Sequence, residues 1–131
     1  MDEAIDRVER LPLGEGRGQF PALRANPALA GLWEPRVLSR EYAPANAPWA
    51  GKAGLTVGMA MTEKQGGTDV RANTSRAVLA SAHEEGGATV RLTGHKWFCS
   101  APMSDGFLTL AQLDGALTCF LLPRWRPDGA R

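Results

Sequence analysis

The sequence predicts a mainly β fold that follows a short helical or irregular N-terminal arm. From Leu55 to Met61, apolar residues occupy every second position, which is the period of a strand with one apolar face. Further on, Asp114-Gly115 separates two apolar runs, and this dipeptide readily takes the two positive φ angles of a tight hairpin turn. Most of the nine prolines lie before residue 50, which marks the first part of the chain as different in character.

Residues 1–50 form the predicted arm, either a linker or the remnant of a helical domain. Short helices are expected over Asp2–Arg10 and near Ala28–Trp33, and the second follows Asn26-Pro27, a typical helix start. The Gly-x-Gly-x-Gly run at Gly14–Gly18 has the glycine spacing of a phosphate loop. Because no predicted strand leads into this run and no predicted helix opens from it, a flexible linker is the preferred interpretation.

Residues 51–131 carry the predicted strands. Beyond the strand at Leu55, a second is expected over Arg71–Ala80 and a third over Ala88–Leu92. Glu85-Gly86-Gly87 supplies a turn between these two, so they are predicted to form a hairpin. A short fourth strand is expected over Lys96–Ser100.

The last predicted hairpin consists of Phe107–Leu113 and Ala116–Leu122. Pro123 ends it, because proline cannot donate a hydrogen bond to a strand ladder. Short strands with turns at intervals of about eight to twelve residues are typical of a sandwich or a barrel. Apolar residues on these strands are expected to contribute to the core, or to an apolar face left exposed by a missing partner: Leu55, Val57, Leu92, Leu108, Leu110, Phe120 and Leu121.

Composition excludes several broad classes of function. The chain has 131 residues, of which 44% are hydrophobic and 22% charged, as in globular proteins of one domain. Its formal net charge of +1 gives no general attraction to nucleic acid or to an anionic membrane. No apolar run approaches the roughly 18 residues of a transmembrane helix, and the acidic start is wrong for a signal peptide, so a cytoplasmic location is predicted.

Metal and hydrolase chemistry find no support in the sequence. Cys99 and Cys119 lie in apolar runs without zinc or redox spacing, and both are expected to be reduced and buried. His83 and His95 have no partner at ligand spacing, so no metal site is predicted. A Gly-x-Ser-x-Gly elbow is absent as well.

The first segment with chemical potential is the exit of the strand at Leu55. Thr62 and Glu63 place a hydroxyl and a carboxylate at its end, and Gly66-Gly67 then allows a tight turn that approaches a ligand closely. Thr68 follows with a further hydroxyl, and backbone N–H groups in such a turn can hold a phosphate oxygen. An ordinary turn between two strands explains the same residues.

The second segment places Trp97, Phe98 and Ser100 within one predicted strand. Alternation would put Phe98 and Ser100 on one face, opposite Trp97 and Cys99. An aromatic ring beside a hydroxyl suits a flat heteroaromatic ligand, which packs on the ring and accepts a hydrogen bond from the hydroxyl. Aromatic pairs on strands are nevertheless common in protein cores.

Taken together, the two segments resemble the middle domain of the acyl-CoA dehydrogenase family. In that domain a strand ends in Thr-Glu before a Gly-Ser-Asp turn, and Gly-x-Lys with an aromatic strand follows after a hairpin. The nearest likeness is to the adaptive-response (AidB-type) branch, which is related to isovaleryl-CoA dehydrogenases. That branch shares the strings standing here as Met61–Gly67, Gly94–Phe98 and Pro123–Gly129. The likeness covers roughly residues 36–131 and implies a partial middle-domain β-barrel.

The resemblance implies FAD as cofactor. Thr62 would bond the pyrimidine end of the flavin, and Ser100 would donate toward its N5, while Phe98 packs on the ring. Thr68, with backbone near Gly67, would meet the pyrophosphate. Thr68 stands where the family has Ser, Lys64 where Pro is common, and Phe98 where Trp is usual. The full expected set is Met59, Met61, Thr62, Gly66, Gly67, Thr68, Phe98 and Ser100.

By the same resemblance, the parent function is oxidation of an acyl-CoA-like thioester, or the DNA-alkylation response of the AidB-type branch, in a homo-oligomer. The catalytic carboxylate lies in the family's C-terminal helical domain, so no catalytic residue is expected here and Glu63 has no such role. The chain is therefore expected to be a C-terminally incomplete piece that is inactive alone.

Two alternatives come from other classes. One is a non-enzymatic β-domain that serves as an interaction module. The other is an OB-like nucleic-acid binder with Trp97, Phe98 and Trp125 as stacking platforms. The near-zero net charge argues against this second alternative, and nucleic acid is not an expected partner of this segment.

Overall fold

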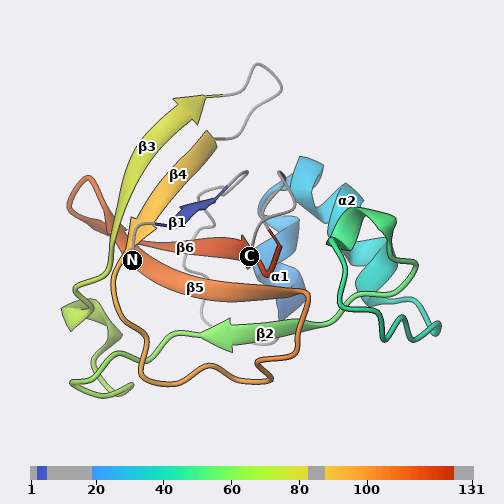
Figure 1. Cartoon of the computed structure of the whole chain (residues 1–131). Coiled ribbons are helices and arrows are strands. Elements are labelled where there is room, and N and C mark those ends of the chain that lie inside the picture. The colour runs from blue at the N-terminus through green and yellow to red at the C-terminus, as the bar shows by residue number, and fades with distance from the viewer. Residues whose placement is uncertain (1–2, 6–18, 83–87, 126–131) are drawn as a thin grey trace.

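The computed structural model describes residues 3–5, 19–82 and 88–125 (Figure 1). Most described elements are strands, which confirms the prediction of a mainly β fold. The strands form one sheet in the order β1-β4-β3-β5-β2, with β6 beside β5, and this sheet is not closed into a barrel. The elements are β1 Glu3–Ile5, α1 Gln19–Arg24, α2 Pro27–Val37, β2 Val57–Ala60, β3 Arg76–Ala82, β4 Ala88–Thr93, β5 Gly106–Leu113 and β6 Ala116–Pro123, with short 3₁₀ helices at Trp49–Gly51 and Val70–Ala72.

The helix predicted after Asn26-Pro27 is confirmed as α2. Asn26 caps it by accepting a hydrogen bond from the backbone N–H of Leu29 at 3.1 Å, and Pro27 occupies the first turn, where no donor is needed. The helix predicted over Asp2–Arg10 is wrong where the chain is described, because Glu3–Ile5 pairs with β4 as a strand. Helix α1 was not predicted, and Gly14–Gly18 lies outside the described residues.

The β5–β6 hairpin is the centre of the fold, and its prediction is confirmed. Asp114 and Gly115 turn the chain with φ angles of 49° and 79°, and β6 ends at Pro123 as expected. Both faces of this hairpin are buried, because α1 and α2 pack on one side and β3 and β4 on the other. Burial on both faces explains why the two strands are continuous apolar runs rather than alternating ones.

Two hydrophobic clusters lie on these two faces. Every residue predicted for the core is buried or packs against one of the clusters as a partly buried side chain. The helix-side cluster contains Leu23, Leu29, Trp33, Leu55, Leu108, Leu110, Cys119 and Leu121. The hairpin-side cluster contains Ala77, Val90, Ala111 and Phe120.

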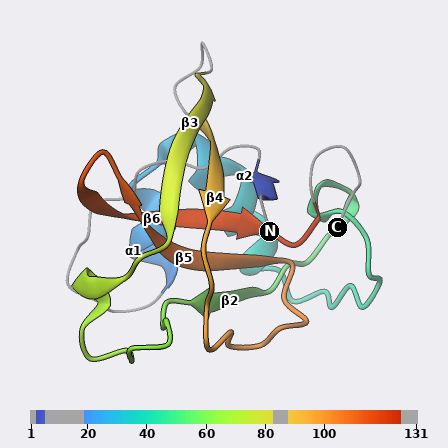
Figure 2. The same ribbon diagram turned by 60° about the vertical axis from the view of Figure 1, so that its left-hand side comes forward.

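One edge of β5 is shared between two strands. β2 runs parallel to its first half, up to the pair Ala60–Thr109, and β3 meets it near its end at the pair Arg76–Gln112. β3 and β4 rise steeply across the direction of β2, β5 and β6 (Figures 1 and 2). Residues 61–75 therefore form a long excursion between two strands that use the same edge.

Several predicted details differ from the structure. The second strand starts at Arg76 rather than Arg71, but its hairpin with β4 is confirmed, and the turn at 85–87 lies outside the described residues. Lys96–Ser100 is not a strand, since only Ser100 forms a bridge, with Met59 of β2. Without a ladder to hold this segment in a sheet, Cys99 is exposed, so the prediction that both cysteines are buried is wrong for it.

Candidate functional site

The two segments that the sequence singled out lie side by side. The backbone N–H of Trp97 donates to the carbonyl of Thr62, and that of Ser100 donates to the carbonyl of Met59, each at 2.8 Å. These bonds bring Thr62 and Ser100 to one site, although the segments are far apart in the sequence.

Gly58 makes this close approach possible. A Cβ atom at Gly58 would lie 2.2 Å from the carbonyl oxygen of Ser100 and 3.0 Å from the ring of Phe107, closer than ordinary van der Waals contact. A side chain at this position would therefore push the segment around Ser100 away from β2. The chain then leaves the site through Ala101, which has a φ of 49°.

The loop after β2 turns back onto Thr62. Gly66 has a φ of 111°, a conformation that favours glycine, and a Cβ atom on Gly67 would lie 2.9 Å from the Thr62 hydroxyl. Thr62 is half-buried, while Thr68 and Ser100 are exposed. Within the described part of the chain, the hydroxyl groups of these three residues have no hydrogen-bond partner, so they are free to bind a ligand.

Exposed apolar side chains border these hydroxyls. Phe98 is 64% exposed and Trp97 54%, and their rings meet edge to face with centroids 6.4 Å apart. Met59 on β2 is also exposed, which differs from the predicted continuous apolar face. Met61 lies apart from this group: it is half-buried against the helix-side cluster, and its carbonyl accepts a hydrogen bond from the Asn73 side chain.

Sequence reasoning placed Glu63 at the end of the strand but did not predict its burial or its partners. Its carboxylate is only 3% exposed and accepts hydrogen bonds from the N–H and hydroxyl of Thr74, the N–H of Ser75 and the ammonium of Lys96. Burial alone would raise the pKa of Glu63, but hydrogen bonds from Ser75, Thr74 and Lys96 outweigh it and lower the pKa to about 2. Glu63 is thus a fixed anion and not a proton acceptor at neutral pH.

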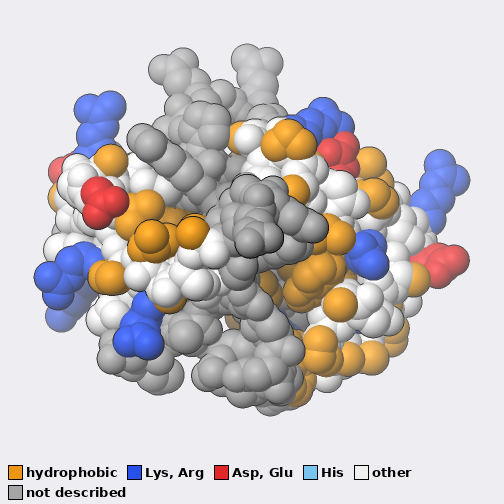
Figure 3. All heavy atoms as spheres, turned by 90° about the horizontal axis from the view of Figure 1, so that it is seen from above, with side chains coloured by type: hydrophobic (Ala, Val, Ile, Leu, Met, Phe, Trp, Pro, Cys, Tyr) orange, Lys and Arg blue, Asp and Glu red, His pale blue; other side chains and the backbone are white. Residues whose placement is uncertain are grey.

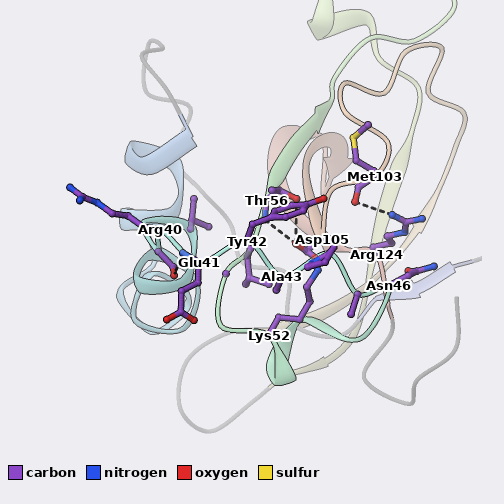
Figure 4. Close-up of a pocket in the computed structure, with 16 residues that line it drawn as sticks. Arg40, Glu41, Tyr42, Ala43, Asn46, Lys52, Thr56, Met103, Asp105 and Arg124 are labelled. Carbon is purple, nitrogen blue, oxygen red and sulfur yellow. Dashed lines mark hydrogen bonds and ion pairs between the residues drawn. The ribbon is translucent and has the colours of Figure 1, made fainter.

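A separate pocket of about 470 Å³ lies at the other end of β2 (Figure 4). Loop residues 39–46 form one of its walls. Lys52 and Asp105, both largely buried, form an ion pair there, and Asp105 also accepts a hydrogen bond from the backbone N–H of Thr56 at 2.9 Å. Neither the pocket nor this ion pair was predicted, because nothing in the local pattern of either segment indicates its distant partner.

The described residues contain no group of three or more metal-ligating side chains. His95 is exposed, and its ring lies near that of Trp97. Cys119 is buried, and this burial raises the pKa of its thiol to about 11. Among the described helices, none has the length and apolar character needed to cross a membrane.

Comparisons with known proteins find the family that the sequence motifs resemble. The model for the middle domain of acyl-CoA dehydrogenases matches residues 58–131, more than half of the chain. Over 99 residues the chain is 50% identical to AidB of Escherichia coli (strain K12), whose name places it with the acyl-CoA dehydrogenases; this match covers 76% of the chain and 17% of AidB. The solved apo form of Bd2924 is similar with a TM-score of 0.51 and 39% identity, over 60% of this chain and 17% of that one.

The chain therefore spans a small part of the length of both relatives. The match of the family model over residues 58–131 includes the loop after β2 and the Trp97–Ser100 segment. On this evidence the chain belongs to the acyl-CoA dehydrogenase family, as an AidB-like middle domain.

Proposed function

We propose that this chain supplies the FAD-contacting surface of an acyl-CoA dehydrogenase-type flavoprotein. The observation that carries the proposal is the pair of backbone hydrogen bonds that joins Met59–Thr62 to Trp97–Ser100. These bonds gather unpartnered hydroxyls and exposed aromatic rings at one surface.

The residues of the site fit the chemistry of FAD. A flavin has a flat ring system with nitrogen and oxygen acceptors, for which the Thr62 and Ser100 hydroxyls are donors and the Phe98 ring a packing surface. Its pyrophosphate requires N–H and hydroxyl donors on a backbone that approaches closely, which Gly66, Gly67 and Thr68 provide. When bound, FAD supplies the acceptor for a hydride.

In this proposal each residue of the site contacts a different part of FAD. Thr62 donates toward the pyrimidine end of the flavin, where negative charge develops on reduction, and Ser100 donates toward N5. Phe98 excludes water from one side of the ring. Thr68 and the backbone at Gly67 hold the pyrophosphate. Met59 borders the same exposed surface, while Met61 supports it from the helix-side cluster.

The substrate and the assembly belong to the proposal as well. The parent protein would oxidise an acyl-CoA-like thioester in the cytoplasm as a homo-oligomer, or act in the response to DNA alkylation. Abstraction of an α-proton requires a base of suitable pKa at the substrate. Glu63 cannot serve, because its carboxylate is enclosed by four donors and has a pKa of about 2. Turnover therefore requires a base other than Glu63.

A titration of the purified chain with FAD, followed by flavin fluorescence, tests the proposal. Thr62→Val and Ser100→Ala should each weaken binding by about 2- to 10-fold, the effect of losing one hydrogen bond to a neutral acceptor of the oxidised flavin. Thr56→Val is the matched control, since Thr56 precedes β2 at the opposite end and its hydroxyl faces Asp105. Equal FAD affinity in all four proteins would refute the assignment of the site.

The exposed Trp97–Phe98 pair is the one observation that favours a nucleic-acid binder instead. The formal net charge of +1 argues against this alternative. On the face seen from above in Figure 3, the Lys and Arg side chains stand apart from one another. Salt-dependent binding of single-stranded DNA at Trp97, without FAD binding, would favour this alternative over the flavin site.

A further inference from the structure

A salt bridge joins the two site segments directly beside a backbone hydrogen bond. Lys96 Nζ lies 2.9 Å from Glu63 Oε1. Glu63 follows Thr62 and Lys96 precedes Trp97, the two residues joined by the N–H to carbonyl bond. The segments are thus held by two neighbouring links, one through side chains and one through the backbone.

Lys96 also fills a gap in the sheet. The edge of β5 pairs with β2 as far as Thr109 and with β3 at Gln112, so Leu110 lies between the two paired stretches. The Leu110 carbonyl accepts a hydrogen bond from Lys96 Nζ at 2.7 Å. Because a buried carbonyl needs a donor, the ammonium group takes the place of a strand partner.

Glu63 is fixed from the opposite side. One carboxylate oxygen accepts from the N–H of Thr74 at 2.6 Å, and the other accepts from the N–H of Ser75 at 2.9 Å. A Cβ atom on Gly94 would lie 2.1 Å from the Ser75 hydroxyl, so the chain leading to Lys96 packs closely against the same residue. The pair is consequently tied to the residues before β3 as well as to β5.

We propose that Glu63 and Lys96 are positioning residues that set the separation of the Thr62 and Ser100 hydroxyls, and through it the affinity and reduction potential of a bound flavin. This inference rests on the proposed function. Glu63 and Lys96 themselves bond protein groups only, as far as the described chain shows. Hydrogen bonds to the pyrimidine end and to N5 of a flavin depend on donor position, so a shift of one segment against the other changes the electronics of the ring.

The ligand-free test measures amide hydrogen exchange in Lys96→Met. The N–H groups of Trp97 and Ser100 should exchange about tenfold faster or more, because the segment loses its side-chain link. Lys52→Met is the matched control, since it breaks the other largely buried Lys–carboxylate pair, Lys52–Asp105, at the far end of β2. It should leave both exchange rates unchanged, and Lys96→Arg should restore protection by keeping a cation.

The FAD test measures the bound-flavin spectrum and reduction potential in the same variants. Lys96→Met should weaken FAD binding about tenfold and shift both readouts, whereas Lys52→Met should change neither. Normal exchange at Trp97 and Ser100 in Lys96→Met overturns the inference whether or not FAD binds. Fast exchange in Lys96→Met, in a chain that binds no FAD, supports the positioning role of Glu63 and Lys96 and refutes the proposed function instead.

Lys96→Gln is the second variant in case Lys96→Met does not fold by circular dichroism. It keeps a neutral donor and removes the charge, so an intermediate loss of protection at Trp97 and Ser100 is expected. Wild-type exchange rates in Lys96→Gln, together with an unshifted flavin spectrum, would overturn the inference.

Discussion

Replacement of Glu63 by Gln should destabilise the chain at neutral pH, and this effect should disappear in acid. The pKa of Glu63 is lowered from 4.5 to about 2, since hydrogen bonds outweigh the opposing effect of burial. A folded-state pKa below the unfolded value means that the carboxylate stabilises the fold above about pH 4.5, and that this contribution is lost as the pH falls toward 2. A shift of about 2.5 units corresponds to about 3 kcal/mol at neutral pH.

The assay is urea unfolding followed by tryptophan fluorescence, at pH 7 and in steps down to about pH 3. The measured quantity is the difference in free energy of unfolding between the wild type and Glu63→Gln. Other carboxylates titrate in both proteins, so their contributions cancel in this difference. The difference should be about 3 kcal/mol at pH 7 and should shrink steadily below about pH 4.5.

Glu34→Gln is the control for this experiment. The hydrogen bond from Arg24 lowers the pKa of Glu34, but Arg24 is exposed and solvent screens this ion pair. Its stability difference should be small at every pH. If the difference for Glu63→Gln is absent, or stays constant between pH 7 and pH 3, the account of Glu63 as a buried, hydrogen-bonded anion is wrong.

Two further predictions test the site and the core. Gly58→Ala places a methyl group 2.2 Å from the Ser100 carbonyl oxygen. Hydrogen exchange should therefore show faster exchange of the Ser100 amide, and fluorescence titration should show a lower FAD affinity. Unchanged values for both would show that the close approach is not essential. Phe120→Ala removes a ring that is 0% exposed and should cost about 3–5 kcal/mol in urea unfolding, whereas Phe98→Ala, at an exposed ring, should change stability by less than about 0.5 kcal/mol.

Local sequence signals predicted much of the fold correctly. The Asn26-Pro27 start of α2 and the Asp114-Gly115 turn depend only on neighbouring residues, so both can be predicted without knowledge of the rest of the chain. The continuous apolar runs of β5 and β6 also indicated burial, although not that both faces are covered. The motifs of the two segments of the candidate site indicate a ligand site without showing that the segments lie side by side.

What could not be predicted depends on contacts between distant residues. The parallel pairing of β2 with β5 leaves no local trace, and neither does the gap at Leu110 that Lys96 fills. The sequence pattern therefore predicts Lys96 as part of a strand, although its side chain binds Glu63 in the structure. The same irregular path exposes Cys99, although its apolar neighbours in the sequence predict burial.

We propose that FAD binds where the loop after β2 meets the Trp97–Ser100 segment. The most direct test of this proposal is a titration of the ¹⁵N-labelled chain with FAD, in which the amide resonance of each residue is followed by NMR. Saturable shifts are expected to concentrate at Thr62, Gly66–Thr68 and Phe98–Ser100. Shifts confined to the opposite pocket around Lys52 and Asp105, or no saturable shift at any residue, would contradict it.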